Sequence, residues 1–187
     1  MAELSREELR RRFSSSKNFN DIFDAFEAAL QQRIDDIELY RLLFWNDALS
    51  ADEITLFGEK LAKEFPHITY DVYMWMANVF EALYASSDNF EHSLQYYQKA
   101  ALVNPSAPDP YLDACDCYEP DLNIPPLSTL IDFVKTGLET VPNKKSLLQR
   151  LSYLYRLLGD DDLAEYYRLK ADEASTTGSA PGESPAV

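Results

Sequence analysis

The sequence has little of what sheets and membrane spans require. Only 5 of its 187 residues are glycine, and it contains no run in which β-branched and polar residues alternate, so we expect no β-sheet. No apolar run approaches the roughly 18–20 residues that cross a bilayer. The charged opening MAELSR also lacks the apolar stretch of a secretory signal. These absences predict an all-α, cytoplasmic protein that does not insert into a membrane.

Cysteine and histidine are equally scarce, with two of each. Cys115 and Cys117 lie two positions apart on a predicted helix, where their side chains point to different sides and cannot easily form a disulfide. His67 and His92 are isolated, and no spacing links them to the cysteines in a known zinc pattern. We therefore expect no metal site, and we expect Cys115 to be a small buried packing residue.

The motifs of common catalytic sites are missing too. The chain has no glycine-rich phosphate loop, no Gly-x-Ser-x-Gly elbow and no His-Glu-x-x-His helix. Carboxylates are abundant, but nothing marks a pair of them as catalytic. The sequence therefore predicts a non-enzymatic protein with no catalytic residues and no cofactor.

Positive charge is the scarcer sign, because 17 lysine and arginine residues stand against 32 aspartate and glutamate residues. Residues 18–128 carry a net charge of −15, whereas residues 1–17 carry +2 and residues 129–187 carry −2. Such an acidic body repels phosphate, so nucleic acid is not an expected partner. By itself the charge indicates solubility rather than a site. We interpret residues 1–17 as a basic arm with a short helix, capped by Ser5, that can lie against the body.

The clearest pattern that is present spans residues 147–171. Two apolar stripes at helical spacing flank Gly159, which is typical of the residue that ends a helix in the left-handed conformation. Any of Asp160, Asp161 and Asp162 can cap the second helix. The stripes comprise Leu148, Leu151, Tyr155 and Leu158 before the glycine, and Leu163, Ala164, Tyr167 and Ala171 after it. The pattern predicts a helical hairpin that cannot bury its apolar side alone.

This hairpin resembles a tetratricopeptide repeat, a helix–turn–helix of about 34 residues. The matching residues are Leu148, Leu151, Ser152, Tyr155, Gly159, Ala164 and Ala171. Similar spacings recur upstream in Tyr111, Ala114, Cys115 and Tyr118 with Leu130, Val134, Gly137 and Pro142, and in Ala77, Phe80 and Tyr84 with Ser93, Tyr97, Ala100 and Pro105. The resemblance covers about three repeats over residues 70–173. It implies an all-α fold of antiparallel hairpins stacked as a right-handed superhelix; an irregular helical bundle is the alternative.

The remaining segments complete the expected organisation. Residues 18–69 form an N-terminal helical block, a degenerate repeat or a cap, in which Ser50 and Glu53 make a capping box. Residues 174–187 contain no aromatic residue and are expected to be disordered. The helical patterns across the chain predict about seven to nine helices.

The resemblance also implies a function and a site. In such repeats the first helices line a concave groove, so the chain is expected to bind a peptide or protein there, as an adaptor or chaperone. The expected groove residues are Trp75, Asn78, Asp109, Leu112, Asp116, Glu119, Gln149, Tyr153 and Arg156. In the first repeat, a shift of frame would instead place Tyr70, Tyr73 and Ala77 there.

The character of these residues predicts the partner. Aspartates at positions 109 and 116 would repel the carboxylate tails that chaperone-clamp repeats bind, so we expect a segment with Lys or Arg beside apolar residues. The alternative function is a structural subunit whose repeats mediate self-association, as a homo-oligomer, or assembly with a fixed partner.

Overall fold

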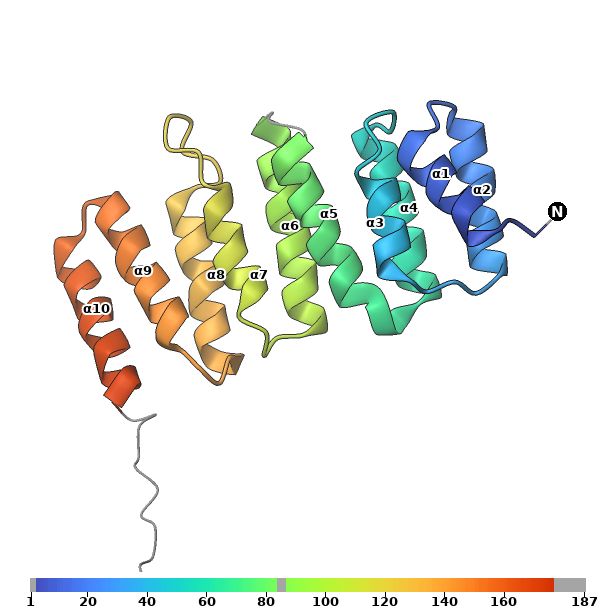
Figure 1. Ribbon diagram of the computed structural model, residues 1–187. Helices are drawn as coiled ribbons and strands as arrows, with labels where there is room; N and C mark the ends of the chain where they lie inside the picture. The colour runs from blue at the N-terminus through green and yellow to red at the C-terminus, as the bar shows by residue number, and fades with distance from the viewer. Residues whose placement is uncertain (1–2, 84–86, 177–187) are drawn as a thin grey trace, which may run out of the picture. The chain divides into compact units, whose positions relative to one another are not determined.

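The computed structural model describes residues 3–83 and 87–176, which form ten α-helices and two short 3₁₀ segments (Figure 1). No β-strand occurs in this part of the chain, so the all-α prediction is confirmed. The number of helices exceeds the expected seven to nine. Helix α1 (Arg6–Ser15) is the short helix expected in the basic arm, and α7 (Asp109–Asp113) is the shortest of the ten described helices. None of the described helices is both long and apolar enough to cross a membrane.

Contacts divide the chain into two compact units, Met1–Asn104 and Pro105–Val187, called here the N-terminal and C-terminal units. The N-terminal unit contains α1, α2 (Phe19–Gln31), α3 (Ile37–Phe44), α4 (Ala51–Glu64), the 3₁₀ segment η1 (Pro66–Ile68), α5 (Thr69–Leu83) and α6 (Ser87–Val103). The C-terminal unit contains α7, the 3₁₀ segment η2 (Ala114–Cys117), α8 (Leu127–Thr140), α9 (Lys145–Leu158) and α10 (Asp161–Thr176).

The basic arm folds as helix α1 and packs on α2 and α3. Ser5 caps it by accepting a hydrogen bond from the Glu8 N–H at 3.2 Å. Hydrogen bonds from Arg11 and Arg12 lower the pKa of the Glu8 carboxyl to about 2. Leu9 and Phe13 are fully buried. The apolar side of α1 is therefore part of the N-terminal unit's core.

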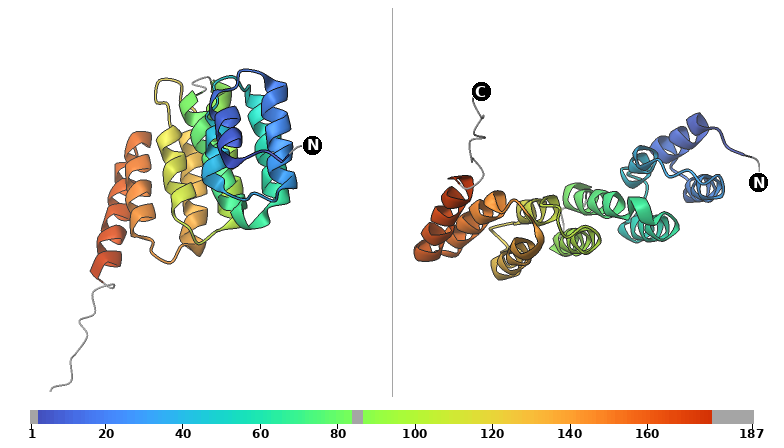
Figure 2. Two further views of the ribbon diagram at one scale, coloured as in Figure 1. Left: turned by 45° about the vertical axis from the view of Figure 1, so that its right-hand side comes forward. Right: turned by 90° about the horizontal axis from the view of Figure 1, so that it is seen from below.

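Two features of the N-terminal unit follow local signals in the sequence. The expected capping box at the start of α4 is present, with Ser50 and Glu53 bonded reciprocally. Helices α5 and α6 lie side by side (Figures 1 and 2), and the Ser93 hydroxyl donates to the Ala77 carbonyl at 2.9 Å. The small residues at this contact let the two helices approach closely.

The C-terminal unit departs from an ideal repeat near residue 114. Helix α7 ends at Asp113, and the chain winds more tightly through η2 before Glu119 and Ile124 pair in an isolated β-bridge. Further along, Gly137 of α8 lets the Tyr111 ring approach so closely that a Cβ there would lie 2.8 Å from the ring. The first helix of the middle repeat is thus short but tightly packed on the second.

Helices α9 and α10 form the expected hairpin. The Ser152 hydroxyl donates to the Ala164 carbonyl at 2.7 Å, and Asp160 caps α10 by accepting from the Leu163 N–H at 3.0 Å. Helix α10 continues to Thr176, so the first three residues of the segment expected to be disordered, 174–187, are helical. The prediction for residues 177–187 lies outside the described residues.

Replacing Gly159 by valine is expected to lower the free energy of unfolding by about 1–2 kcal/mol. Gly159 has φ 84° and ψ 14°, as the sequence predicted, and no neighbouring atom lies within 4 Å of a built Cβ. The cost is therefore backbone strain, which a β-branched residue suffers most. Chemical denaturation measures it. Gly159→Asn is the control, since asparagine tolerates this conformation; equal midpoints for both variants would contradict the explanation.

Candidate binding groove

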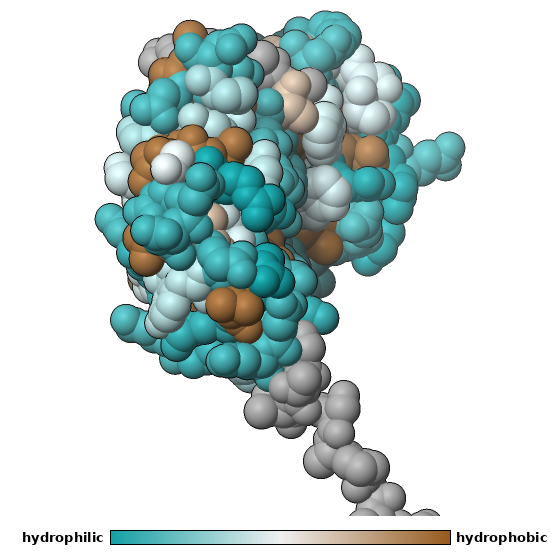
Figure 3. Space-filling model, turned by 90° about the vertical axis from the view of Figure 1, so that its left-hand side faces the viewer, coloured by the Kyte–Doolittle hydropathy of each residue, from teal (hydrophilic) through white to brown (hydrophobic). Residues whose placement is uncertain are grey.

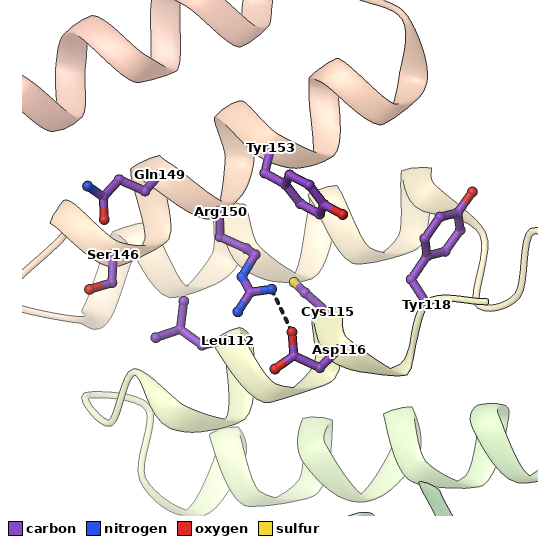
Figure 4. Close-up of a pocket in the computed structure, with 8 residues that line it drawn as sticks. All are labelled: Leu112, Cys115, Asp116, Tyr118, Ser146, Gln149, Arg150 and Tyr153. Carbon is purple, nitrogen blue, oxygen red and sulfur yellow. Dashed lines mark hydrogen bonds and ion pairs between the residues drawn. The ribbon is translucent and has the colours of Figure 1, made fainter. Parts of the chain in front are cut away.

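A pocket of about 530 Å³ opens within the C-terminal unit, between the α7–η2 segment and α9 (Figure 4). We call it the groove. Its lining residues are Leu112, Cys115, Asp116 and Tyr118 from the first side, and Ser146, Gln149, Arg150 and Tyr153 from α9. Four of them, Leu112, Asp116, Gln149 and Tyr153, belong to the site expected from the sequence.

An ion pair crosses the groove. Arg150 Nη1 of α9 donates to Asp116 Oδ1 of η2 at 2.7 Å (Figure 4). The two side chains differ in exposure, because 59% of Asp116 but only 26% of Arg150 is accessible. The carboxylate is thus the more accessible charge of the pair.

Cys115 lies beside this ion pair and is only 4% exposed. Its thiol donates to the Tyr111 carbonyl at 3.3 Å. Burial raises the pKa of the Cys115 thiol to about 12, so the group stays protonated at neutral pH and is a poor nucleophile or metal ligand. The prediction that Cys115 is a buried packing residue is confirmed.

The apolar character of the groove comes from side chains on both sides. Leu112 is half-buried, and Tyr153 is 51% exposed on α9. Tyr118 is half-buried, and its hydroxyl donates to Asn123 Oδ1 at 3.3 Å. An aromatic ring exposed beside an aliphatic side chain is a suitable surface for an apolar ligand group.

Three expected residues of the C-terminal unit do not line the groove. Asp109 is exposed at the first position of α7, and Arg156 is exposed in the last turn of α9. Glu119 follows the end of η2, where its carboxylate accepts the Asp121 N–H at 3.3 Å. A 3₁₀ segment turns 120° per residue rather than 100°, so residues after it point in other directions than a continuous helix predicts.

The two expected residues of the N-terminal unit have partners within that unit. Trp75 is half-buried, and the Arg41 guanidinium lies 5.3 Å from its ring. The Asn78 amide donates to the Met74 carbonyl at 2.9 Å, and its oxygen accepts the Tyr97 hydroxyl at 3.1 Å. These contacts hold both side chains in place on α5.

Sequence reasoning missed Arg150, Ser146, Cys115 and Tyr118 as groove residues. Pro105 and Pro142, which follow two successive repeats, lie 37 residues apart. A repeat of this length makes Tyr153 the equivalent of Asp116 in the next repeat. The ion pair instead joins residues 34 apart, so the partner of Asp116 on α9 is Arg150, three residues before Tyr153. The opposite charges of the two segments could have indicated that they pair. Helix α9 holds Lys145, Arg150 and Arg156 and no acid, whereas the α7–η2 segment holds three aspartates and no base.

Comparison with known proteins bears on the fold. No family model and no curated protein matches the chain. A crystal structure of MamA has a TM-score of 0.52 at 16% identity, over 96% of this chain and 99% of that chain. A structure of MamA MSR-1 has a TM-score of 0.50 at 18% identity, over 93% and 98%. MamA is a tetratricopeptide-repeat protein, so this chain has a helical-repeat fold of that type.

Proposed function

We propose that this chain is a non-enzymatic member of the tetratricopeptide-repeat family, an adaptor or chaperone that binds a peptide or protein segment in the groove. The observation that carries the proposal is the unequal exposure of the groove's ion pair: 59% for Asp116 against 26% for Arg150. A ligand that enters the groove therefore meets a carboxylate first, beside Leu112 and Tyr153. The ligand that fits is a segment with Lys or Arg next to an apolar side chain.

Charge alone cannot supply the affinity of such a site. An exposed ion pair contributes roughly 0.2–1 kcal/mol, whereas a well-packed aromatic side chain can dominate binding. Tyr153, half exposed on α9, is the candidate anchor. We therefore expect salt to weaken binding in part and not to abolish it, because the apolar contribution is not screened.

Arg150 has a definite role in this proposal, since it competes with the ligand for Asp116. Removing the charge of Arg150 and removing the charge of Asp116 should thus change the affinity for a cationic peptide in opposite directions. Arg150→Gln frees the carboxylate and is expected to strengthen binding of a cationic peptide several-fold, while Asp116→Asn is expected to weaken it several-fold. Asp132→Asn is the matched control, because Asp132 is an exposed aspartate on α8 that does not line the groove.

The experiment begins with peptides selected from a displayed random library on the purified protein. Their affinities for the wild type and the three variants are then measured by calorimetry. The proposal expects selected sequences with Lys or Arg beside aliphatic or aromatic residues, and a loss on Asp116→Asn with a gain on Arg150→Gln. Enrichment of acidic peptides, or equal effects of the two groove variants, would overturn it.

A further inference from the structure

Helix α10 carries apolar side chains on two sides. One face packs on α9, where Ala164 and Ala171 are buried and the Tyr167 ring stacks on Tyr155 at 5.4 Å. The other face is exposed, with 37% of Leu163, 47% of Tyr166 and 48% of Leu169 accessible. Figure 3 shows apolar patches among polar side chains at this end of the C-terminal unit.

Two opposite charges lie at equal distances from Tyr166 in the sequence, and the Lys170 ammonium lies 5.1 Å from the Tyr166 ring of its own chain. Leu163 and Leu169 each lie three positions from it in the sequence. Asp162 and Lys170 each lie four positions from it, one on either side. The face therefore begins with Asp162 and Leu163 and ends with Leu169 and Lys170. Its two ends carry opposite charges, and each charge is followed inward by a leucine.

We propose that this face, residues 162–170 of α10, binds a second copy of the chain, with the two α10 helices antiparallel and a twofold axis at Tyr166. In this arrangement Asp162 of each copy lies at the level of Lys170 of the other. Leu163 of each copy likewise lies at the level of Leu169 of the other. Each copy thus offers the same patch, as a twofold interface requires. Two ion pairs flank a cluster of four leucines and two tyrosines.

Other alignments of the same two helices are less favourable. In a parallel pair, Asp162 of one copy lies beside Asp162 of the other, and Lys170 lies beside Lys170, so like charges repel. An antiparallel pair shifted by three residues brings Asp162 to the level of Glu173. On the adjoining flank, Arg168 bonds Glu165 at 2.7 Å and Asp172 at 2.9 Å within its own helix.

The size of the face sets the strength of the contact. Three apolar side chains per copy fall short of a standard interface, so the dimer is expected to be weak, with a dissociation constant roughly in the micromolar range. The face shares no residue with the groove. The inference therefore goes beyond peptide binding, and either can fail while the other holds.

The test measures the mass of the full chain by sedimentation over roughly 1 µM to 1 mM. Wild type is expected to pass from monomer to dimer. Asp162→Lys and Lys170→Asp each replace two symmetry-related attractions by repulsions and should raise the dissociation constant at least about tenfold. Mixing the two variants restores opposite charges at both ends, so heterodimers should form at wild-type strength.

Asp161→Lys is the matched control, because Asp161 is an exposed acid in the same first turn but lies outside the patch. It should dimerise like the wild type. A wild type that stays monomeric up to the highest concentration would overturn the proposal. So would a dimer that the single reversals leave unchanged, or variants that form no heterodimer when mixed, because the contact would then lie on another surface.

Discussion

Replacing Phe26 by alanine is expected to lower the free energy of unfolding of the N-terminal unit by about 3–5 kcal/mol. Phe26 of α2 is fully buried, with its ring centroid 4.8 Å from that of Phe57 on α4 and 6.0 Å from that of Tyr40 on α3. It therefore joins three helices, and its removal leaves a cavity that rigid neighbours cannot fill.

Tryptophan fluorescence during chemical denaturation measures this loss selectively. Both tryptophans, Trp45 and Trp75, belong to the N-terminal unit. Phe23→Ala is the matched control, because Phe23 lies on the same helix but is only half-buried. If the two variants lose equal stability, Phe26 does not hold the position in the core that its burial indicates.

Replacing Tyr153 by alanine is expected to weaken binding of a selected peptide by about thirtyfold, which corresponds to a loss of about 2 kcal/mol. The reason is that Tyr153 is the large aromatic side chain of the groove that remains half exposed in the free protein. Its ring can be covered by a ligand with little loss of side-chain freedom.

Tyr166→Ala is the control for this variant. Tyr166 is 47% exposed against 51% for Tyr153, but it lies on α10 and does not line the groove. Calorimetry at low micromolar protein concentration compares the two. A Tyr153→Ala variant that binds as tightly as Tyr166→Ala would show that the groove does not use this ring.

Local signals in the sequence predicted much of the fold. Gly159 and the aspartates after it predicted the turn between α9 and α10, and Ser50 with Glu53 predicted the start of α4. These signals work because caps and left-handed residues act within a few positions. The apolar stripe that contains Leu151 and Tyr155 was likewise correct, since both are buried.

The site was less accessible to prediction because its geometry depends on two segments at once. Nothing local shows that α7 ends at Asp113 or that η2 follows it, and Glu119 after η2 is not among the residues that line the groove. The pairing of Asp116 with Arg150 depends on how η2 lies against α9, which the spacing of prolines does not reveal. For Trp75 the cation–π partner, Arg41, comes from another helix.

The most direct test of the groove maps where a selected peptide binds. Backbone amide chemical shifts of isotope-labelled protein are followed by NMR while the peptide is added. The largest changes are expected in two segments that face each other across the groove, residues 112–118 and residues 146–153. Changes confined to the N-terminal unit or to α10, with these two segments unaffected, would contradict the assignment of the groove as the binding site.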